Sequence, residues 1–319
     1  MKVSVYCLTY NHEEYIGQTL EGFVSQITNF DYEVFVHDDA STDGTANIIR
    51  EYEKNYPDII HAIYQKENQY SQGKRIVANF IISKMQGEYV AVCEGDDYWS
   101  DPYKLQKQID FLDSHPEYSA CVHNTLVLEL DSGERRLVNP SLESYDLDIE
   151  KVLIEGSSEY HTSSVVYPMK YARIVHSEER PEFFKKPKRI GDYPLAIYLT
   201  LQGKVRYLPD IMSVYRRGTP GSWTKRFSGV DKFVAMRKSI IDMLQSVDEY
   251  TDYKLHSQIR SVVEERYWEI LMLSTDIKVL KEKEIKNVFH KMSFEQKIKT
   301  IIKLLFLNKY RLKHNKLTL

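Results

Sequence analysis

The stretch EYVAVCEGDDYWSDP, residues 88–102, joins a short apolar run to a cluster of acidic residues. Residues 89–93 have the length and composition of a buried strand, and Glu94, Asp96 and Asp97 follow at once. Carboxylates contribute nothing to an apolar core, whereas hard cations such as Mg²⁺ and Mn²⁺ prefer oxygen ligands. The acids therefore predict a divalent-cation site at the end of a strand, with a solvated loop as the alternative.

Two earlier segments repeat this arrangement of a strand followed by polar residues. The apolar run at residues 2–9 leads into the polar turn at residues 9–11, and the strand pattern at residues 33–36 leads into Asp38 and Asp39. Strand and helix patterns alternate with short connections over about the first 115 residues, which predicts a mostly parallel α/β sheet flanked by helices. Ligands of such sheets bind outside the carboxyl ends of the strands. The three polar clusters are therefore expected to converge on one crevice.

The local signals also predict where several helices and strands begin and end. Asn11 is expected to cap the first helix, since its side chain suits an N-cap and acids follow it. A strand from Tyr118 turns back as a hairpin at residues 131–133. A helix near residues 148–155 is expected to end at a glycine. Two short strands are predicted at residues 205–208 and 211–215.

The pattern changes twice along the chain, which suggests two domains. Strand and helix patterns continue in a less regular order after residue 116, and only helical patterns follow from about residue 230. We therefore expect a first domain at residues 1–225, divided into halves at 1–116 and 117–225. A helical C-terminal region at residues 226–319 completes the chain.

Composition limits the class of protein. The chain has 319 residues and a net charge of −3, which does not favour nucleic-acid binding. Its three cysteines lie in apolar runs, which is typical of reduced thiols in a reducing compartment. No apolar run approaches the ~18 residues of a membrane span, and Met1 leads straight into a strand with no room for a signal peptide. A cytoplasmic protein is expected.

The C-terminal end carries most of the positive charge. Residues 291–319 hold eight Lys and Arg against one acid, a net charge of +7 that leaves −10 for the remainder. Ile298, Ile301, Ile302 and Leu305 share one face of a predicted helix that is otherwise rich in lysine. Such a basic amphipathic helix is typical of binding to the inner face of a membrane, although it can equally cover the protein's own core or a second subunit.

Four segments in order resemble the family 2 glycosyltransferases of the GT-A fold, which are inverting enzymes that use nucleotide-activated sugars. They are VSVYCLTYN (3–11), HDDASTDGT (37–45), GEYVAVCEGDDYW (87–99) and GDYPLAIYLTLQGKVRYLPDIMSVYRR (191–217). The resemblance covers roughly residues 1–220. It implies a GT-A, Rossmann-like sheet whose first half binds the nucleotide and whose second half binds the acceptor.

The resemblance implies donor-binding roles for the first two polar clusters. Thr9, Tyr10 and Asn11 match the opening turn, where the tyrosine ring can stack on a base. Asp39 matches the acid that accepts a hydrogen bond from uracil N3–H, a proton that cytosine lacks. For Asp38, a direct contact with the nucleotide and the capping of a turn remain open. Asp43 is expected to cap a helix.

The resemblance assigns the acids after residue 93 to the donor's ribose and to the metal. Asp96 matches the carboxylate near the ribose, and Asp97 matches the ligand of a divalent cation, Mn²⁺ or Mg²⁺. Lys74 and Arg75 lie in the preceding loop, where one of them is expected to hold the pyrophosphate, with a solvated helix start as the alternative for Lys74. Many members of the family have an arginine before the asparagine of the next helix, and this chain has Ala78 there.

The resemblance also implies a catalytic base and a region that binds the acceptor. Asp192 matches the base that removes the proton from the attacking hydroxyl, although the usual preceding acid is Gly191 here and a helix N-cap is the alternative role. His161 is expected to line the acceptor pocket, or to be structural. Arg216 and Trp223 lie after the base in a loop that closes over the substrates in relatives, where the indole stacks on a sugar or packs in the core.

These features together predict a transferase that moves a sugar from a nucleotide diphosphate donor, a UDP-sugar, to a hydroxyl of a glycan or lipid-linked acceptor. Such reactions assemble capsule, lipopolysaccharide or exopolysaccharide. Two rival functions remain: a module that binds nucleotide sugar or glycan without turnover, and a sugar nucleotidyltransferase. The latter would need a glycine-rich loop after the first strand, which the chain lacks. The sequence leaves the sugar, the acceptor, the choice of cation and the oligomeric state open.

Overall fold

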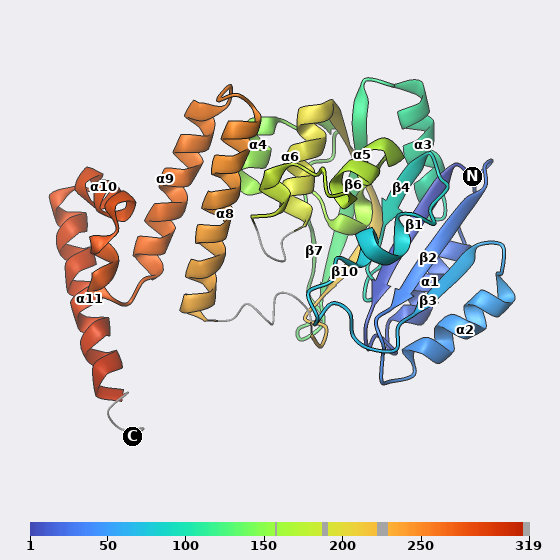
Figure 1. Ribbon diagram of the computed structural model, residues 1–319, viewed down its shortest axis with the longest axis horizontal. Helices are drawn as coiled ribbons and strands as arrows, with labels where there is room; N and C mark the ends of the chain where they lie inside the picture. The colour runs from blue at the N-terminus through green and yellow to red at the C-terminus, as the bar shows by residue number, and fades with distance from the viewer. Residues whose placement is uncertain (157, 187–190, 222–228, 315–319) are drawn as a thin grey trace. The chain divides into compact units, whose positions relative to one another are not determined.

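The computed structural model describes residues 1–156, 158–186, 191–221 and 229–314, with side chains described as far as residue 305. The chain divides into two compact units (Figure 1). The first consists of Met1–Arg180 and Gly191–Ser222, and the second of Pro181–Ile190 and Trp223–Leu319. The predicted domain boundary between residues 225 and 226 falls outside the described residues and stays a prediction.

The first unit is built on one ten-stranded sheet with the order β3-β2-β1-β4-β9-β6-β10-β5, in which β7 also pairs with β6 and β8 with β10. The strands are β1 Val3–Thr9, β2 Tyr32–Asp38, β3 Ile60–Tyr64, β4 Tyr89–Val92, β5 Tyr98–Trp99, β6 Tyr118–Glu129, β7 Arg135–Leu137, β8 Tyr145–Asp146, β9 Val166–Pro168 and β10 Lys204–Arg217. Strands β1 to β4 are parallel, as are β6 and β10, whereas β9 runs antiparallel to both neighbours. The predicted mostly parallel α/β sheet is confirmed.

Helices cover both faces of this sheet (Figure 1). They are α1 Ile16–Val24, α2 Thr45–Asn55, the π-helix Val77–Ile81, α3 Lys104–Ser114, α4 Ile149–Glu155, the 3-10 turn Thr162–Ser164, α5 Met169–His176 and α6 Asp192–Gln202. Alternate residues of β1 and β2 pack with α1, α2 and α3 in one apolar core. On the opposite face Tyr6 contacts His176 of α5, and His37 contacts Phe80 of the π-helix.

The register of the parallel strands sets the position of the polar clusters. Thr9 at the end of β1 lies opposite Asp38 at the end of β2, and Tyr6 lies opposite Val92 at the end of β4. Both faces of these strands are covered, which explains why their sequences are almost continuously apolar. The polar residues that follow each strand therefore emerge at one edge of the sheet, as the sequence predicts.

Two local predictions were wrong. The first helix begins at Ile16, and Asn11 instead adopts a positive φ of 55° in the turn before it. Asparagine tolerates this conformation better than most residues. The two strands predicted after Gly203 form the single strand β10, whose pairing with β6 shifts register around Pro209 and Asp210. The irregularity absorbs the proline, which lacks the N–H needed for a sheet.

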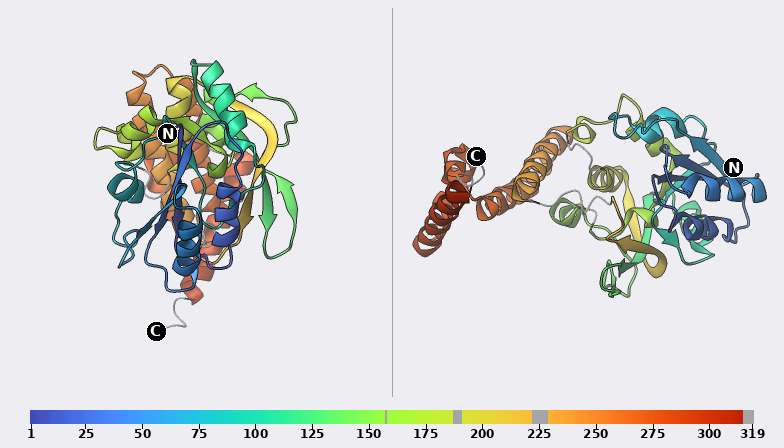
Figure 2. Two further views of the ribbon diagram at one scale, coloured as in Figure 1. Left: turned by 90° about the vertical axis from the view of Figure 1, so that its right-hand side faces the viewer. Right: turned by 90° about the horizontal axis from the view of Figure 1, so that it is seen from below.

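The described residues of the second unit are mostly helical, and its helices from Val230 onward are drawn in orange to red in Figure 2. It contains the 3-10 turns Glu182–Phe184 and Ile277–Lys281 and the helices α8 Val230–Tyr250, α9 His256–Leu273, α10 Lys283–Lys291 and α11 Phe294–His314. Ile241, Ile270 and Leu304 belong to its apolar core. None of the described helices is long and apolar enough to cross a membrane.

Helix α11 confirms part of the amphipathic face predicted for the C-terminal end. Ile298, Ile302 and Leu305 are exposed, and Phe294 extends the same stripe by one turn. Ile301 is only half-buried, and Leu304 packs fully into the core of the unit. The helix therefore has one face that packs internally and a second apolar face that the described residues leave exposed.

Candidate active site at the carboxyl ends of the parallel strands

The acidic loop after β4 is fixed to β1 and α1. The Gly95 N–H donates to the Leu8 carbonyl at 2.9 Å, and the Thr19 hydroxyl donates to the carbonyls of Gly95 and Asp97 at 3.0 and 2.6 Å. A Cβ atom added to Gly95 would lie only 2.7 Å from the Thr9 Cβ, so the close approach of loop and strand requires glycine. These contacts fix the backbone of the loop, and the loop in turn fixes where its carboxylates begin.

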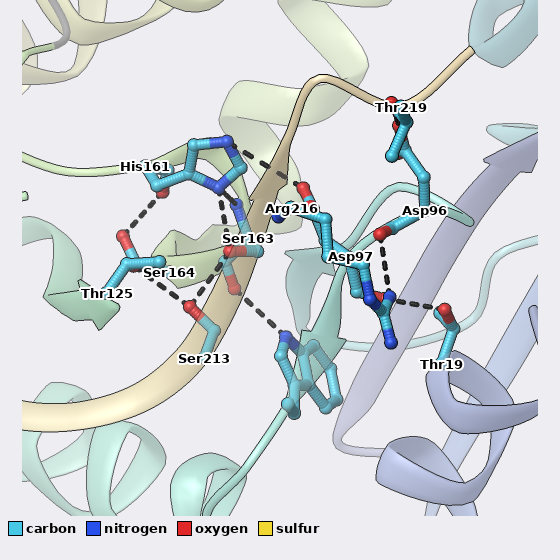
Figure 3. A network of polar contacts seen from close by, with 11 residues as sticks. Thr19, Asp96, Asp97, Thr125, His161, Ser163, Ser164, Ser213, Arg216 and Thr219 are labelled. Atoms are coloured by element: carbon cyan, nitrogen blue, oxygen red, sulfur yellow. Dashed lines mark hydrogen bonds and ion pairs between the residues drawn. The ribbon is translucent and has the colours of Figure 1, made fainter. Parts of the chain in front are cut away.

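Asp97 is almost completely buried, with 1% of its surface exposed. Its Oδ1 accepts a hydrogen bond from the Arg216 backbone N–H at 2.9 Å, and its Oδ2 lies 3.7 Å from Nε2 of His161 (Figure 3). Burial, followed by the charge of Asp96, raises the pKa of Asp97 well above its usual range. A buried carboxylate of this kind is stabilised as an anion by a cation.

Arg216 lies beneath the acids and ties the end of β10 to the acidic loop. Its guanidinium donates to the Asp96 carbonyl at 2.7 Å and to the Gln18 side chain, and it stacks 4.5 Å from the centre of the Tyr98 ring. The sequence places this arginine in a loop near the acceptor. The structure instead places it in β10 and buries it, and this local contact was not predicted.

Two further carboxyl groups, those of Asp96 and Glu94, lie close to Asp97. Thr219 donates to Oδ2 of Asp96 at 2.7 Å. Half-buried Glu94 has its pKa raised to about 8, first by burial and then by the charges of Asp96 and Asp192. Asp192 is thus close enough to Glu94 for their charges to interact. Carboxylates that repel one another in partly buried surroundings favour the binding of a cation.

Asp192 is the first residue of α6, and Gly191 rather than Asp192 takes the N-cap position. Its Oδ1 accepts a hydrogen bond from the N–H of Tyr193 at 2.9 Å, and its side chain is exposed. Its charge acts on the pKa of Tyr160 and of His161 as well as on that of Glu94. The structure therefore places the predicted base beside the acidic cluster.

The Asp38–Asp39 turn uses its carboxylates to order the neighbouring loops. Asp38 accepts hydrogen bonds from the N–H and the hydroxyl of Ser41. The two oxygens of Asp39 accept from the N–H groups of Gln69 and Tyr70, at 2.8 and 3.0 Å. Each carboxylate oxygen has a second lone pair, so these bonds leave Asp39 able to accept from a ligand.

The opening turn interlocks with the start of α2. Asn11 accepts a hydrogen bond from the Thr42 N–H at 2.8 Å, and Glu13 accepts one from the Gly44 N–H at 2.9 Å. Asp43 accepts from the N–H of Thr45, the first residue of α2, at 3.0 Å, whereas the N-cap position itself is taken by Gly44 rather than by the predicted Asp43. These hydrogen bonds tie the opening turn and the turn before α2 into one surface.

The remaining residues predicted to bind the sugar donor differ in their exposure and in their hydrogen bonds. Tyr10 is 39% exposed, whereas the Thr9 side chain is buried and its hydroxyl has no hydrogen-bond partner among the described residues. Lys74 is exposed. Arg75 donates to the carbonyls of Val175 and Ser177 at 3.2 and 3.3 Å and pairs with a glutamate of the same segment, so its guanidinium is held at the end of α5. Their roles toward the donor stay predictions.

His161 lies beside Asp97, and its predicted place in an acceptor pocket stays a prediction. Its ring stacks on that of Tyr215, with the ring centres 4.2 Å apart, and its Nδ1 lies 2.9 Å from the Ser163 hydroxyl. Burial lowers the pKa of His161 to about 4, so the imidazole is neutral near neutral pH. Trp223, the last of the predicted residues, lies outside the described residues.

Comparison with known proteins decides the family. Residues 4–139 match the sequence profile described as Glycosyl transferase family 2. Residues 4–139 of the chain belong to glycosyltransferase family 2. It is 36% identical over 235 residues to the uncharacterized protein Rv1520 of Mycobacterium tuberculosis, a match that covers 72% of this chain and 63% of that protein. It is 37% identical over 110 residues to the putative teichuronic acid biosynthesis glycosyltransferase TuaG of Bacillus subtilis, which covers 34% of this chain and 41% of the relative.

Solved structures confirm the GT-A-like fold of the chain. Staphylococcus aureus TarS residues 1–349, in complex with UDP-GlcNAc, superposes with a TM-score of 0.60 at 18% identity, covering 93% of this chain and 92% of that one. The mannosyltransferase PcManGT from Pyrobaculum calidifontis, in complex with GDP-Man and Mn²⁺, gives 0.51 at 16% identity, covering 98% and 80%. These likenesses concern the fold alone. The chain spans 63% of the length of the first curated relatives that it matches.

The described residues of the acidic cluster offer a cation part of its ligand shell. Among the described residues, no three His, Cys, Asp or Glu side chains lie close enough together to hold a metal ion. Mg²⁺ and related ions commonly take one or two carboxylates from the protein and complete their shell with water and substrate phosphates. The Asp97 Oδ2, which lies beside His161 and faces away from the bond to Arg216, fits such a partial site.

Sequence reasoning missed His12, which lies against the acidic loop. A Cβ atom on Gly95 would lie 2.9 Å from its Nδ1, and this nitrogen is buried without a hydrogen-bond partner among the described residues. Thr219, which donates to Asp96, and Gln18, which accepts from Arg216, were missed too. No sequence signal marks these residues, because their contacts arise from the turn at Asn11 and from the path of β10.

Proposed function

We propose that this protein transfers a sugar from a UDP-sugar to a hydroxyl of a glycan or lipid-linked acceptor, with inversion at the anomeric carbon. The observation that carries the proposal is the convergence of Asp39, Asp97 and Asp192 at one edge of the sheet, beside Glu94 and Asp96. Binding alone would require the first two carboxylates, whereas the third is suited to proton transfer.

The donor's uracil would lie against the surface formed by the opening turn, residues 9–11, and the turn that carries Asp39. The free lone pairs of Asp39 suit the N3–H of uracil, and the exposed Tyr10 ring is placed to stack on a base. Thymine presents the same N–H, and one relative is a dTDP-rhamnosyl transferase of Shigella flexneri. A test of the donor must therefore include both bases.

The leaving nucleotide requires stabilisation of negative charge. Asp97 would hold a divalent cation, Mn²⁺ or Mg²⁺, which neutralises the charge that develops on the diphosphate as it departs. Asp96 lies one residue away, where its Oδ2 is oriented by Thr219 for a contact with the ribose. Arg216 keeps both acids in place through its bonds to Asp97 and to the Asp96 carbonyl.

Asp192 would act as the general base. An inverting displacement needs a carboxylate that removes the acceptor's proton on the side opposite the leaving group. Its position on the first turn of a buried helix gives the carboxylate a rigid support, while its exposure leaves it accessible to an acceptor hydroxyl. The hydrogen bond from the Tyr193 N–H orients the carboxylate on the first turn of the helix.

The acceptor would belong to cell-surface polysaccharide synthesis on the cytoplasmic side of the membrane. Relatives are named for teichuronic acid biosynthesis and for glucosyl transfer to poly(ribitol-phosphate). The exposed apolar stripe of α11, on a segment with net charge +7, would bind an anionic membrane surface where a lipid-linked acceptor is anchored.

A donor panel tests the proposal directly. Purified protein is incubated with Mn²⁺ or Mg²⁺ and with UDP-, dTDP- and GDP-sugars, and slow hydrolysis is scored as released nucleoside diphosphate. Release from one donor, lost with EDTA and in Asp97→Asn and Asp192→Asn but kept in the surface control Asp113→Asn, supports the proposal. Binding of a donor without release, even with candidate acceptors, would favour a non-catalytic binding module.

A further inference from the structure

We propose that His161 is the second protein ligand of the divalent cation, through Nε2, so that the site combines one carboxylate and one imidazole and prefers Mn²⁺ over Mg²⁺. This inference rests on the cation of the proposed function and goes beyond it, because it names the partner of Asp97 and the identity of the ion. Figure 3 shows the His161 ring directed toward Asp97.

The distance between the two side chains suits two ligands of one ion. Nε2 of His161 lies 3.7 Å from Oδ2 of Asp97. In an octahedral shell with bonds of about 2.1 Å, adjacent ligand atoms lie roughly 3.0 Å apart and opposite ones roughly 4.2 Å. The observed separation falls between these limits and is too long for a direct hydrogen bond. Both atoms can therefore reach a common ion after a shift of well under 1 Å.

The hydroxyl groups behind the ring favour the tautomer that a metal requires. Ser163 donates its hydroxyl hydrogen to Ser213 at 2.9 Å, so its oxygen is free to accept from Nδ1–H of His161, also at 2.9 Å. The chain continues from Ser213 to Thr125 at 2.9 Å. Metal-binding histidines usually donate the other ring N–H to such a partner. With the proton on Nδ1, the lone pair of Nε2 points toward Asp97.

The competing contact in the same turn is weaker. The backbone N–H of Ser163 approaches Nδ1 at 3.3 Å, an interaction that would place the ring proton on Nε2 instead. That tautomer would direct an N–H at Asp97 across 3.7 Å, without forming a good bond. The shorter contact and the continuous hydroxyl chain therefore favour the ligand form.

Both ligands are held rigidly before any ion binds. The ring stacks on Tyr215, and the Trp99 indole N–H donates to the Ser163 carbonyl at 2.9 Å, which fixes the turn that carries the histidine. Arg216 holds Oδ1 of Asp97 and leaves Oδ2 for the ion. Preorganised ligands lower the entropy lost on binding.

The combination of one carboxylate oxygen and one imidazole nitrogen as metal ligands makes the site selective between Mn²⁺ and Mg²⁺. Mg²⁺ is a hard ion that takes oxygen ligands, whereas sites with nitrogen ligands bind the first-row transition metals, a series that begins with Mn²⁺. A second carboxylate beside Asp97 would leave the choice of ion open. A nitrogen ligand from His161 shifts the preference of the site toward Mn²⁺.

Pulsed electron paramagnetic resonance of Mn²⁺ bound with UDP tests the inference without turnover. We expect nuclear modulation from ¹⁴N in the wild-type complex, replaced by the ¹⁵N pattern when histidine is isotopically labelled. His161→Ala and His161→Gln should remove the modulation and weaken Mn²⁺ binding by roughly 10-fold or more, by analogy with losses seen when metal-site partners are removed. Ser163→Ala should keep the modulation and weaken binding less, and the distant control His61→Gln should change neither.

The outcomes separate this inference from the proposed function. Bound Mn²⁺ without nitrogen modulation in the wild type overturns the role of His161, even if a donor is hydrolysed. No Mn²⁺ binding in the presence of UDP overturns it as well. Modulation that depends on His161, in a protein that releases nucleotide from no donor, upholds the metal site and contradicts the transferase. If His161→Ala fails to fold, the spectrum of His161→Gln decides, because labelled histidine in the wild type alone would not distinguish His161 from His12, which lies against the same loop.

Discussion

Lys104 is a fully buried lysine at the start of α3, and its replacement by methionine should stabilise the protein in a pH-dependent way. Its Nζ lies 4.0 Å from the centre of the Trp99 ring and has no hydrogen-bond partner among the described residues. Burial lowers the pKa of Lys104 from 10.5 to about 7. Methionine has a similar length and no charge, so Lys104→Met removes the desolvation cost while it preserves the packing.

The sign of the pH dependence follows from the direction of this shift. Between pH 7 and pH 10.5 the unfolded chain binds a proton at this lysine that the native protein does not, so the wild type gains stability as the pH rises. The gain is roughly 1.4 kcal/mol per pH unit. The advantage of Lys104→Met should therefore be largest and constant below pH 7 and should shrink by roughly 2–3 kcal/mol between pH 7 and pH 9.

The assay is urea unfolding of wild type and Lys104→Met at pH 6, 7, 8 and 9. The matched control is Lys107→Met on the same helix, where an exposed ammonium pairs with Asp101 and Asp210 at 2.8 Å each. The pKa of Lys107 is raised by these bonds, so it stays charged and its replacement should have an effect that is small and constant over this range. An equal difference for Lys104→Met at every pH, or a less stable variant below pH 7, would refute the reasoning.

Three further predictions concern the site and the C-terminal helix. Gly95→Ala should lower the free energy of unfolding by about 1–3 kcal/mol and weaken UDP binding, because the added Cβ would collide with Thr9. A melting curve measures the first effect and a UDP titration the second. Normal UDP binding would contradict the placement of the loop. Asp192→Asn should leave the Kd for UDP within about two-fold of wild type and lower donor turnover at least 100-fold, as expected for loss of a general base, whereas weaker binding with normal turnover would point to a donor contact. The double variant Ile298→Glu, Ile302→Glu should no longer co-sediment with phosphatidylserine vesicles, and its melting temperature should not fall because both side chains are exposed. Unchanged sedimentation would exclude this stripe as the membrane contact. A changed oligomeric state would indicate that the stripe binds a second subunit.

Much of the sheet was predictable because its signals are local. Apolar runs such as residues 3–9 mark buried strands wherever they occur, and the helix at Ile149–Glu155 ends at Gly156, which takes a positive φ of 68° that favours glycine. The acids at strand ends were predicted to meet because parallel strands end at one edge. The register of Thr9 with Asp38 confirms that geometry.

The contacts within the site were less predictable. Asn11 was expected to cap its own helix, yet its side chain binds Thr42, 31 residues along the chain. Arg216 was assigned to a loop, yet it holds Asp97, 119 residues earlier in the sequence. A side chain with several possible partners shows no preference among them in the sequence. Only the packed structure brings one of them within bonding distance.

The sequence by itself determined the α/β alternation, the edge of the sheet that carries the acids, and the basic charge of the C-terminal segment, since periodicity, strand polarity and composition are properties of neighbouring residues. The tertiary structure decided which groups face one another there. It brought His161 within 3.7 Å of Asp97 and buried Arg216 beneath the acids. These pairings depend on where β6, β9 and β10 close against β4, and a pairing between distant segments becomes fixed only when the whole sheet packs.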